Sequence, residues 1–113
     1  MSYKDLINDY KFVVLDSNLH PYENINGLHI RTELHEEYNQ STLEEKLLLL
    51  NADVEVLNQV NEVYKRTSKV YIFKNTTKST KQWWWHFEKI VRGELLVEFN
   101  IQTKIIVKND ILK

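Results

Sequence analysis

The sequence predicts an α+β fold: an antiparallel β-sheet in the order β-β-α-β-β-β, with one long amphipathic helix packed across one face of the sheet. Two observations lead to this prediction, a helical pattern in the middle of the chain and alternating apolar residues on either side of it. The length of 113 residues is close to the usual domain size, so residues 1–113 are expected to form a single domain with one core.

The long helix is expected from Ser41 to Arg66. Ser41 and Glu44 have the spacing of a capping box, and Lys65 and Arg66 suit the negative end of a helix. The apolar residues form a seam with a second group beside it: Leu43, Leu47, Leu50, Val54, Leu57 and Tyr64, with polar Asn61, in the seam, and Leu49, Val56, Val60 and Val63 beside it. This arc is wider than a two-stranded seam and favours a helix lying on a sheet; a dimerising coiled coil is the alternative.

Two strands are expected before this helix. Residues 28–34 alternate between apolar and charged side chains, and Lys11–Leu15 is the expected partner strand. Between them, residues 18–27 contain the only proline and one of the two glycines, which indicates a connecting loop. A hairpin is the simplest arrangement of these segments.

The strands expected after the helix are less sharply defined. Val70–Phe73 is rich in β-formers, and from Leu95 to Val107 apolar and polar residues alternate, as one long strand or as a hairpin turning near Gln102. The segment Gln82–Arg92 is ambiguous. Ser79 and Gln82 could cap a helix there, but its Trp, His, Phe, Ile and Val residues prefer strands, so a strand is the favoured interpretation.

The composition limits the classes of protein that fit. The absence of cysteine excludes a disulfide framework and a thiolate zinc site, which suits a reducing cytoplasm. Residues 1–9 carry acids and lack the uncharged stretch of a signal peptide, and no apolar run approaches the roughly 20 residues that cross a bilayer. We therefore expect a cytoplasmic protein without a membrane partner.

Charge is strongly segregated along the chain. Residues 33–62 hold eight acids and one base, a net charge of −7, whereas residues 65–93 hold eight bases and one acid, a net charge of +7. These two segments could neutralise each other within the fold, or they could face a partner as separate charged surfaces.

The basic segment also contains three consecutive tryptophans, of which at least one is expected to stand outside the core. An exposed tryptophan beside cations is a good anchor for a protein partner. The same mixture of cations and rings is used by proteins that bind single-stranded nucleic acid, although no recognised nucleic-acid motif is present. The candidate partner-binding residues are Lys78, Lys81, Trp83, Trp84, Trp85, His86, Lys89 and Arg92.

Two further features concern ionisable groups. On the expected strand, His29, Arg31, Glu33 and His35 share one face, which predicts a solvent face or, as an alternative, an acid–base or metal site. Asp53 falls inside the apolar arc of the long helix, where a carboxylate needs a partner. Arg31 or a base of the later strands is the expected partner.

These observations favour a small intracellular, non-catalytic protein-binding factor of the inhibitor or immunity type, which requires no cofactor and no metal. No nucleophile elbow, phosphate-binding glycine loop or metalloprotease motif occurs, so an enzyme is not expected. The alternatives are a single-stranded nucleic-acid-binding accessory protein that uses residues 74–92 and, third, a metal-dependent hydrolase. Homodimerisation is also possible, because it would cover apolar surface left open on the sheet.

Overall fold

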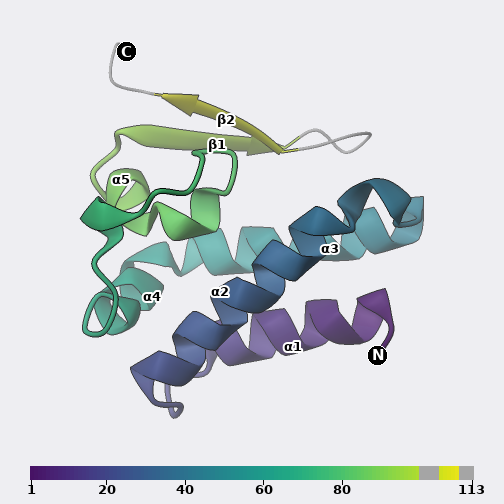
Figure 1. The fold of residues 1–113 in the computed structure, drawn as a ribbon, viewed down its shortest axis with the longest axis horizontal. Coiled ribbons are helices and arrows are strands. Elements are labelled where there is room, and N and C mark those ends of the chain that lie inside the picture. Colours follow the sequence, from purple (N-terminus) through teal and green to yellow (C-terminus); the bar gives the residue numbers. More distant parts are fainter. Residues whose placement is uncertain (100–104, 110–113) are drawn as a thin grey trace.

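The fold is dominated by helices. The structure is a computed structural model that describes residues 1–99 and 105–109. Its helices are α1 (Tyr3–Leu15), α2 (Pro21–Glu36), α3 (Leu43–Asn58), α4 (Val60–Thr67) and α5 (Phe87–Val91), with short 3₁₀ turns η1 (Tyr38–Gln40), η2 (Phe73–Asn75) and η3 (Trp83–Trp85). Strands β1 (Leu95–Phe99) and β2 (Ile105–Asn109) form one antiparallel hairpin beside the helices (Figure 1). The predicted β-β-α-β-β-β sheet is therefore wrong.

The first two segments predicted as strands are helices. Residues 11–15 belong to α1, whose N-terminus has a capping box between Ser2 and Asp5. Residues 28–34 belong to α2, which begins where His20 accepts a hydrogen bond from the backbone N–H of Tyr22 and a proline occupies the first turn. A loop was expected at this proline, but proline also suits the first turn of a helix, where its missing N–H is not needed.

The buried side of α2 explains why the alternating pattern predicted a strand where the structure has a helix. Its buried residues recur at helical spacings of three and four, and they are Asn24, Gly27, Leu28, Arg31 and Leu34. Two of these are polar and one is glycine, so the helical face has little hydrophobic contrast, while the alternation over 28–34 is coincidental. Helices α1 and α2 pack at Gly27, where a Cβ atom would lie 2.5 Å from Cγ2 of Val14.

The predicted long helix is two helices, α3 and α4, separated at Gln59. The capping box uses Thr42 and Glu45, one residue later than expected, because both pairs have the same spacing. Leu49, Val56 and Val63 face the core, whereas the seam residue Leu43 is 61% exposed. Only one side of the apolar arc therefore meets the rest of the fold, and α3 packs on α1 rather than on a sheet.

The segments after α4 are short turns and a hairpin. Residues 70–72, expected to form part of a strand, lie in a turn and an irregular stretch that ends at η2. Residues 82–92, for which a strand was favoured, form η3 and α5 instead, and Gly93 follows with a φ of 76° as expected for a helix end. The alternation from Leu95 corresponds to a hairpin in which Val97 pairs with Val107. The turn predicted near Gln102 lies outside the described residues.

The core lies between the helices and η3. Most of the largest fully buried side chains come from α1, α2 and the tryptophan turn, and α5 adds Phe87; the first group includes Trp83, Trp84, Trp85, Arg31, Tyr10 and Leu28. Short turns carry the tryptophans into the core because successive residues of a 3₁₀ turn point in different directions and each direction here meets a neighbour. The hairpin contributes Leu95 at its start.

Candidate functional site

The acidic surface of α3 is partly neutralised by α1. Lys4 Nζ lies 3.1 Å from Oε1 of Glu44, and Lys11 Nζ lies 3.5 Å from Oε1 of Glu55. Because α1 and α3 run side by side, each lysine meets a glutamate at the same level. Two of the acids, Glu44 and Glu55, therefore pair with lysines of α1 and not with the basic segment, an arrangement that the charge pattern alone did not indicate.

The lysines of the basic segment remain available. Within the described part of the chain, no ion pair joins an acid to any of Lys65, Lys69, Lys74, Lys78, Lys81 and Lys89. Arg66 donates to the backbone carbonyls of Val14 and Leu15, and Arg92 pairs with Glu88 and Glu94. The two charged segments thus do not cancel each other through direct pairing.

The three tryptophans are buried, contrary to the expectation that at least one is exposed. Their exposed fractions are 0%, 0% and 2% for Trp83, Trp84 and Trp85. The indole N–H groups of Trp84 and Trp85 both donate to Oγ1 of Thr32, at 3.0 and 2.9 Å, and Trp83 packs edge-on against Trp84. The turn η3 is therefore part of the core and supplies no ring to a partner.

The carboxylate of Asp53 has the partner predicted for it. Arg31 makes two parallel hydrogen bonds to Asp53, each 2.9 Å long, and both side chains are 1% exposed. Tyr10 donates a third hydrogen bond of 2.6 Å, and the guanidinium lies 4.2 Å from the ring centroid of Trp84. Burial lowers the pKa of Arg31, but the charge of Asp53, its hydrogen bonds and the nearby Tyr10 and Tyr3 together raise that pKa above its usual value. This is a structural ion pair.

The predicted row of ionisable groups on a strand face does not exist. His29, Arg31, Glu33 and His35 lie on α2, where Arg31 is buried and the other three are exposed. His29 and His35 contact different tryptophans: His29 lies tilted against Trp85, and His35 meets Trp84 edge-on. Among the described residues, no group of three or more histidines, cysteines or acids could hold a metal ion.

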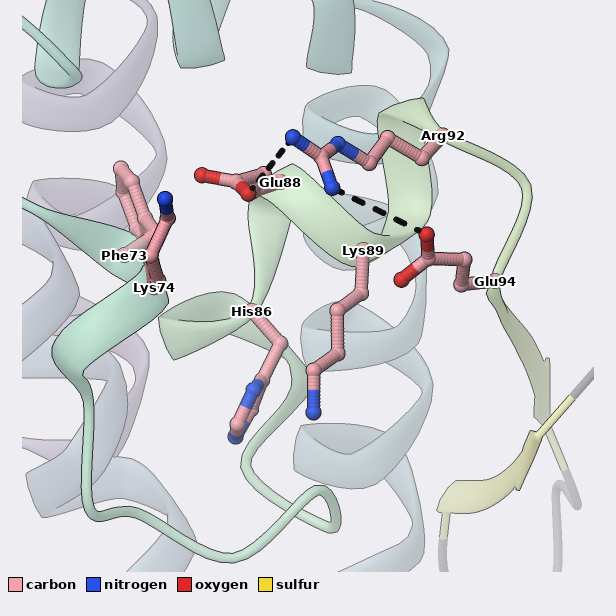
Figure 2. A pocket seen from close by; sticks show the side chains of 7 residues that line it. All are labelled: Phe73, Lys74, His86, Glu88, Lys89, Arg92 and Glu94. Atoms are coloured by element: carbon pink, nitrogen blue, oxygen red, sulfur yellow. Dashed lines mark ion pairs between the residues drawn. The ribbon is translucent and has the colours of Figure 1, made fainter.

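A pocket of about 300 Å³ opens beside the basic segment, between η2 and α5 (Figure 2). It is lined by Phe73, Lys74, His86, Glu88, Lys89, Arg92 and Glu94. Arg92 lies between the two glutamates and pairs with Oε2 of Glu88 at 3.2 Å and Oε2 of Glu94 at 3.9 Å. With both carboxylates held this way, Lys74 and Lys89 are the pocket's uncommitted charges.

His86 joins this pocket to the loop that precedes the tryptophans. Its Nε2 lies 2.8 Å from the carbonyl oxygen of Lys78 and 3.2 Å from that of Ser79. Burial lowers the pKa of His86, and Lys89 lowers it further, against the opposing effect of the loop carbonyls. His86 therefore fixes the basic loop in place while remaining neutral near pH 7.

The structure brings together only part of the predicted partner-binding set. His86, Lys89 and Arg92 line the pocket, and Lys78 is attached to it through its backbone, whereas the tryptophans lie in the core. Lys81 is exposed and lies nearer to α2. Burial and the charge of Arg31 lower the pKa of His35, and the charge of Lys81 lowers it further. Sequence reasoning missed Glu88 and Glu94. Glu88 lies four residues before Arg92, a spacing that permits pairing on a helix, whereas Glu94 follows the helix and no helical spacing indicates its pairing.

Comparisons with family models, curated proteins and solved structures gave no match. Among the described residues, none of the helices has the length and apolar character needed to span a membrane.

Proposed function

We propose that this chain is a small intracellular, non-catalytic protein-binding factor of the inhibitor or immunity type. We propose further that its basic surface, defined as Lys74, Lys78, Lys81, Lys89 and Arg92, meets an acidic surface of its partner. The observation that supports this most directly is the arrangement of charge: α1 lysines occupy α3 acids, while the lysines of the basic surface form no ion pair within the described residues.

The burial of the tryptophans changes how such a partner would be held. Without an exposed tryptophan beside the basic surface, charge complementarity carries recognition, so association is fast and sensitive to salt. His86 supports this role because it holds the backbone of Lys78 and Ser79 and so limits the freedom of the basic loop. A loop that is already ordered loses less entropy when it binds.

The test is capture from the native host, followed by affinity measurements with the purified partner. Lys78→Gln/Lys81→Gln should reduce affinity by about tenfold or more and flatten its salt dependence. Lys4→Gln/Lys11→Gln removes the same charge from α1 and should leave the affinity within about twofold, because those lysines already face acids. Equal affinity for all three proteins would refute the proposal.

Single-stranded nucleic acid is the second candidate, because phosphates also suit exposed lysines. The buried tryptophans remove the rings that would stack on bases, which makes this candidate the weaker one. Its test is a shift assay with labelled single strands at low salt. Loss of the shift in Lys78→Gln/Lys81→Gln but not in Lys4→Gln/Lys11→Gln would favour it, and no shift for the wild type would eliminate it.

Homodimerisation would use the exposed seam of α3. Leu43, Leu47 and Val54 are exposed at spacings of four and seven residues, which places them along one stripe of the helix. Sedimentation should then show a dimer that dissociates in Leu47→Lys/Val54→Lys. A wild-type protein that sediments as a monomer at high concentration would exclude this pairing.

A further inference from the structure

The pocket between η2 and α5 is lined by His86, one ring nitrogen of which is buried without a hydrogen-bond partner among the described residues. His86 is 4% exposed, and its Nδ1 forms no hydrogen bond in the described part of the chain. Nε2 faces two carbonyl oxygens, which only accept, so Nε2 carries the hydrogen. The proton that His86 gains when it becomes charged therefore goes to Nδ1.

The charges around His86 come from three segments. Lys74 lies on η2 with its amine directed away from the His86 ring, Glu88 and Lys89 lie on α5 with the Lys89 amine beside that ring, and Arg92 and Glu94 follow α5 (Figure 2). Tyr64 of α4 donates a hydrogen bond to Oε1 of Glu88, so both oxygens of this carboxylate have a partner within the protein. The loop on the remaining side presents the carbonyl groups of Lys78 and Ser79.

An anion in this pocket would favour the protonated, charged form of His86. Lys89 and burial disfavour a second positive charge, so the ring is neutral while the pocket is empty of anions. A phosphoryl group beside Lys89 would neutralise the ammonium and accept a hydrogen bond from Nδ1–H. The loop carbonyls would continue to accept from Nε2–H, so the charged ring would have both nitrogens satisfied.

We propose that this pocket binds a small phosphomonoester, with the phosphoryl group held between Nζ of Lys89 and a protonated Nδ1 of His86. The volume of about 300 Å³ is at the lower end of the range for small-molecule sites, which fits a compact ligand. Binding takes up one proton per site as His86 becomes charged, so it is tighter at lower pH. This inference does not depend on the identity of the protein partner.

The experiment follows the His86 ring by NMR during titration with glycerol phosphate. The His86 signals should shift, the midpoint of its titration should rise by about one pH unit or more, and glycerol should have no effect. Inorganic sulfate, which does not titrate near neutral pH, should bind more tightly as pH falls. This second probe separates protonation of His86 from protonation of the phosphate.

The matched variants are Lys89→Gln, in the pocket, and Lys69→Gln, an exposed lysine outside it. Lys89→Gln should weaken binding of both anions by about tenfold, and Lys69→Gln should bind like the wild type. Unchanged His86 signals at saturating glycerol phosphate, sulfate affinity independent of pH, or equal losses in the two variants would each overturn the proposal.

Discussion

At the scale of single residues, the core contains buried polar groups that have very few possible hydrogen-bond or ion-pair partners. Arg31 and Asp53 are both buried and pair with each other, and Tyr10 donates to the same carboxylate. Thr32 uses one hydroxyl oxygen to accept from two indole groups and its hydroxyl hydrogen to donate to the carbonyl of Leu28. Such groups tolerate little substitution, because each removal leaves a partner unpaired.

Asp53→Asn should lower the free energy of unfolding by about 3–5 kcal/mol, since it leaves the buried Arg31 charge uncompensated. Chemical denaturation measures this loss. The control is Glu55→Gln, two residues away on the same helix, which breaks only the exposed pair with Lys11 and should cost at most about 1 kcal/mol. Similar losses for the two variants would contradict the structural role of the buried pair.

Thr32→Val should cost about 1–3 kcal/mol or more, because the valine has the same shape but cannot accept from Trp84 and Trp85. Thr32→Ser keeps the hydroxyl and should be the more stable of the two variants, although it loses a methyl group. Denaturation followed by tryptophan fluorescence compares them. A serine variant that is less stable than the valine variant would show that packing of the methyl group matters more.

Stability should also decrease as the solution becomes acidic. Burial lowers the pKa values of His35 and His86 in the folded protein, so the unfolded chain binds more protons around and below pH 6.5. Their contribution is present above the unfolded pKa and is lost as pH falls through the folded values. Denaturation in phosphate-free and sulfate-free buffers between about pH 7.5 and pH 5 tests this. His35→Gln should reduce the slope, and an unchanged slope would exclude a contribution from His35.

At the scale of elements, the sequence predicted some contacts better than it predicted the elements themselves. The polarity of Asp53 predicted a basic partner, and Arg31 was one of the two alternatives for it, although Arg31 was placed on a strand. Alternation over residues 28–34 resembled a strand because the buried face of α2 includes a glycine and two polar residues. The long, regular alternation from Leu95 indicated β-structure correctly, but it left one long strand and a hairpin open, and the structure has the hairpin.

The candidate site was predictable only as a charge pattern. Lys89 and Arg92 could be singled out from sequence, but the pocket also needs Phe73 and Lys74 from η2, which tertiary packing brings near α5. Burial of the tryptophans could not be inferred, because it depends on Thr32, about fifty residues away in sequence, to accept their N–H groups.

The packing of α1 on α2 gives a prediction for a whole element. Gly27→Ala should destabilise the fold by about 1–3 kcal/mol, because the new Cβ would meet Val14 at 2.5 Å. Helix propensity alone would favour alanine by about 1 kcal/mol, so a net loss identifies the steric cost. Asn26→Ala, at the exposed neighbouring position, should change stability by less than about 0.5 kcal/mol. A more stable Gly27→Ala variant would contradict the close approach.

At the scale of the whole molecule, the two kinds of charge occupy different regions. The acid-rich connection between α2 and α3 lies at one end of the long axis, and α4 and α5, with their lysines, lie at the other (Figure 1). Pairing of α1 with α3 reduces the acidic side, whereas the basic side keeps its lysines unpaired among the described residues.

This separation gives the described part of the chain two ends of opposite charge, although the full sequence has a net charge of only −1 at pH 7. Binding to a charged chromatography matrix depends on the charge of the surface in contact with the matrix rather than on the net charge of the whole protein. A protein with a pI near 6.4 should therefore be retained on a cation exchanger at neutral pH, and Lys78→Gln/Lys81→Gln should elute earlier than Lys4→Gln/Lys11→Gln. Molecules in solution would also tend to orient end to end, so low salt should promote reversible head-to-tail attraction that added salt removes.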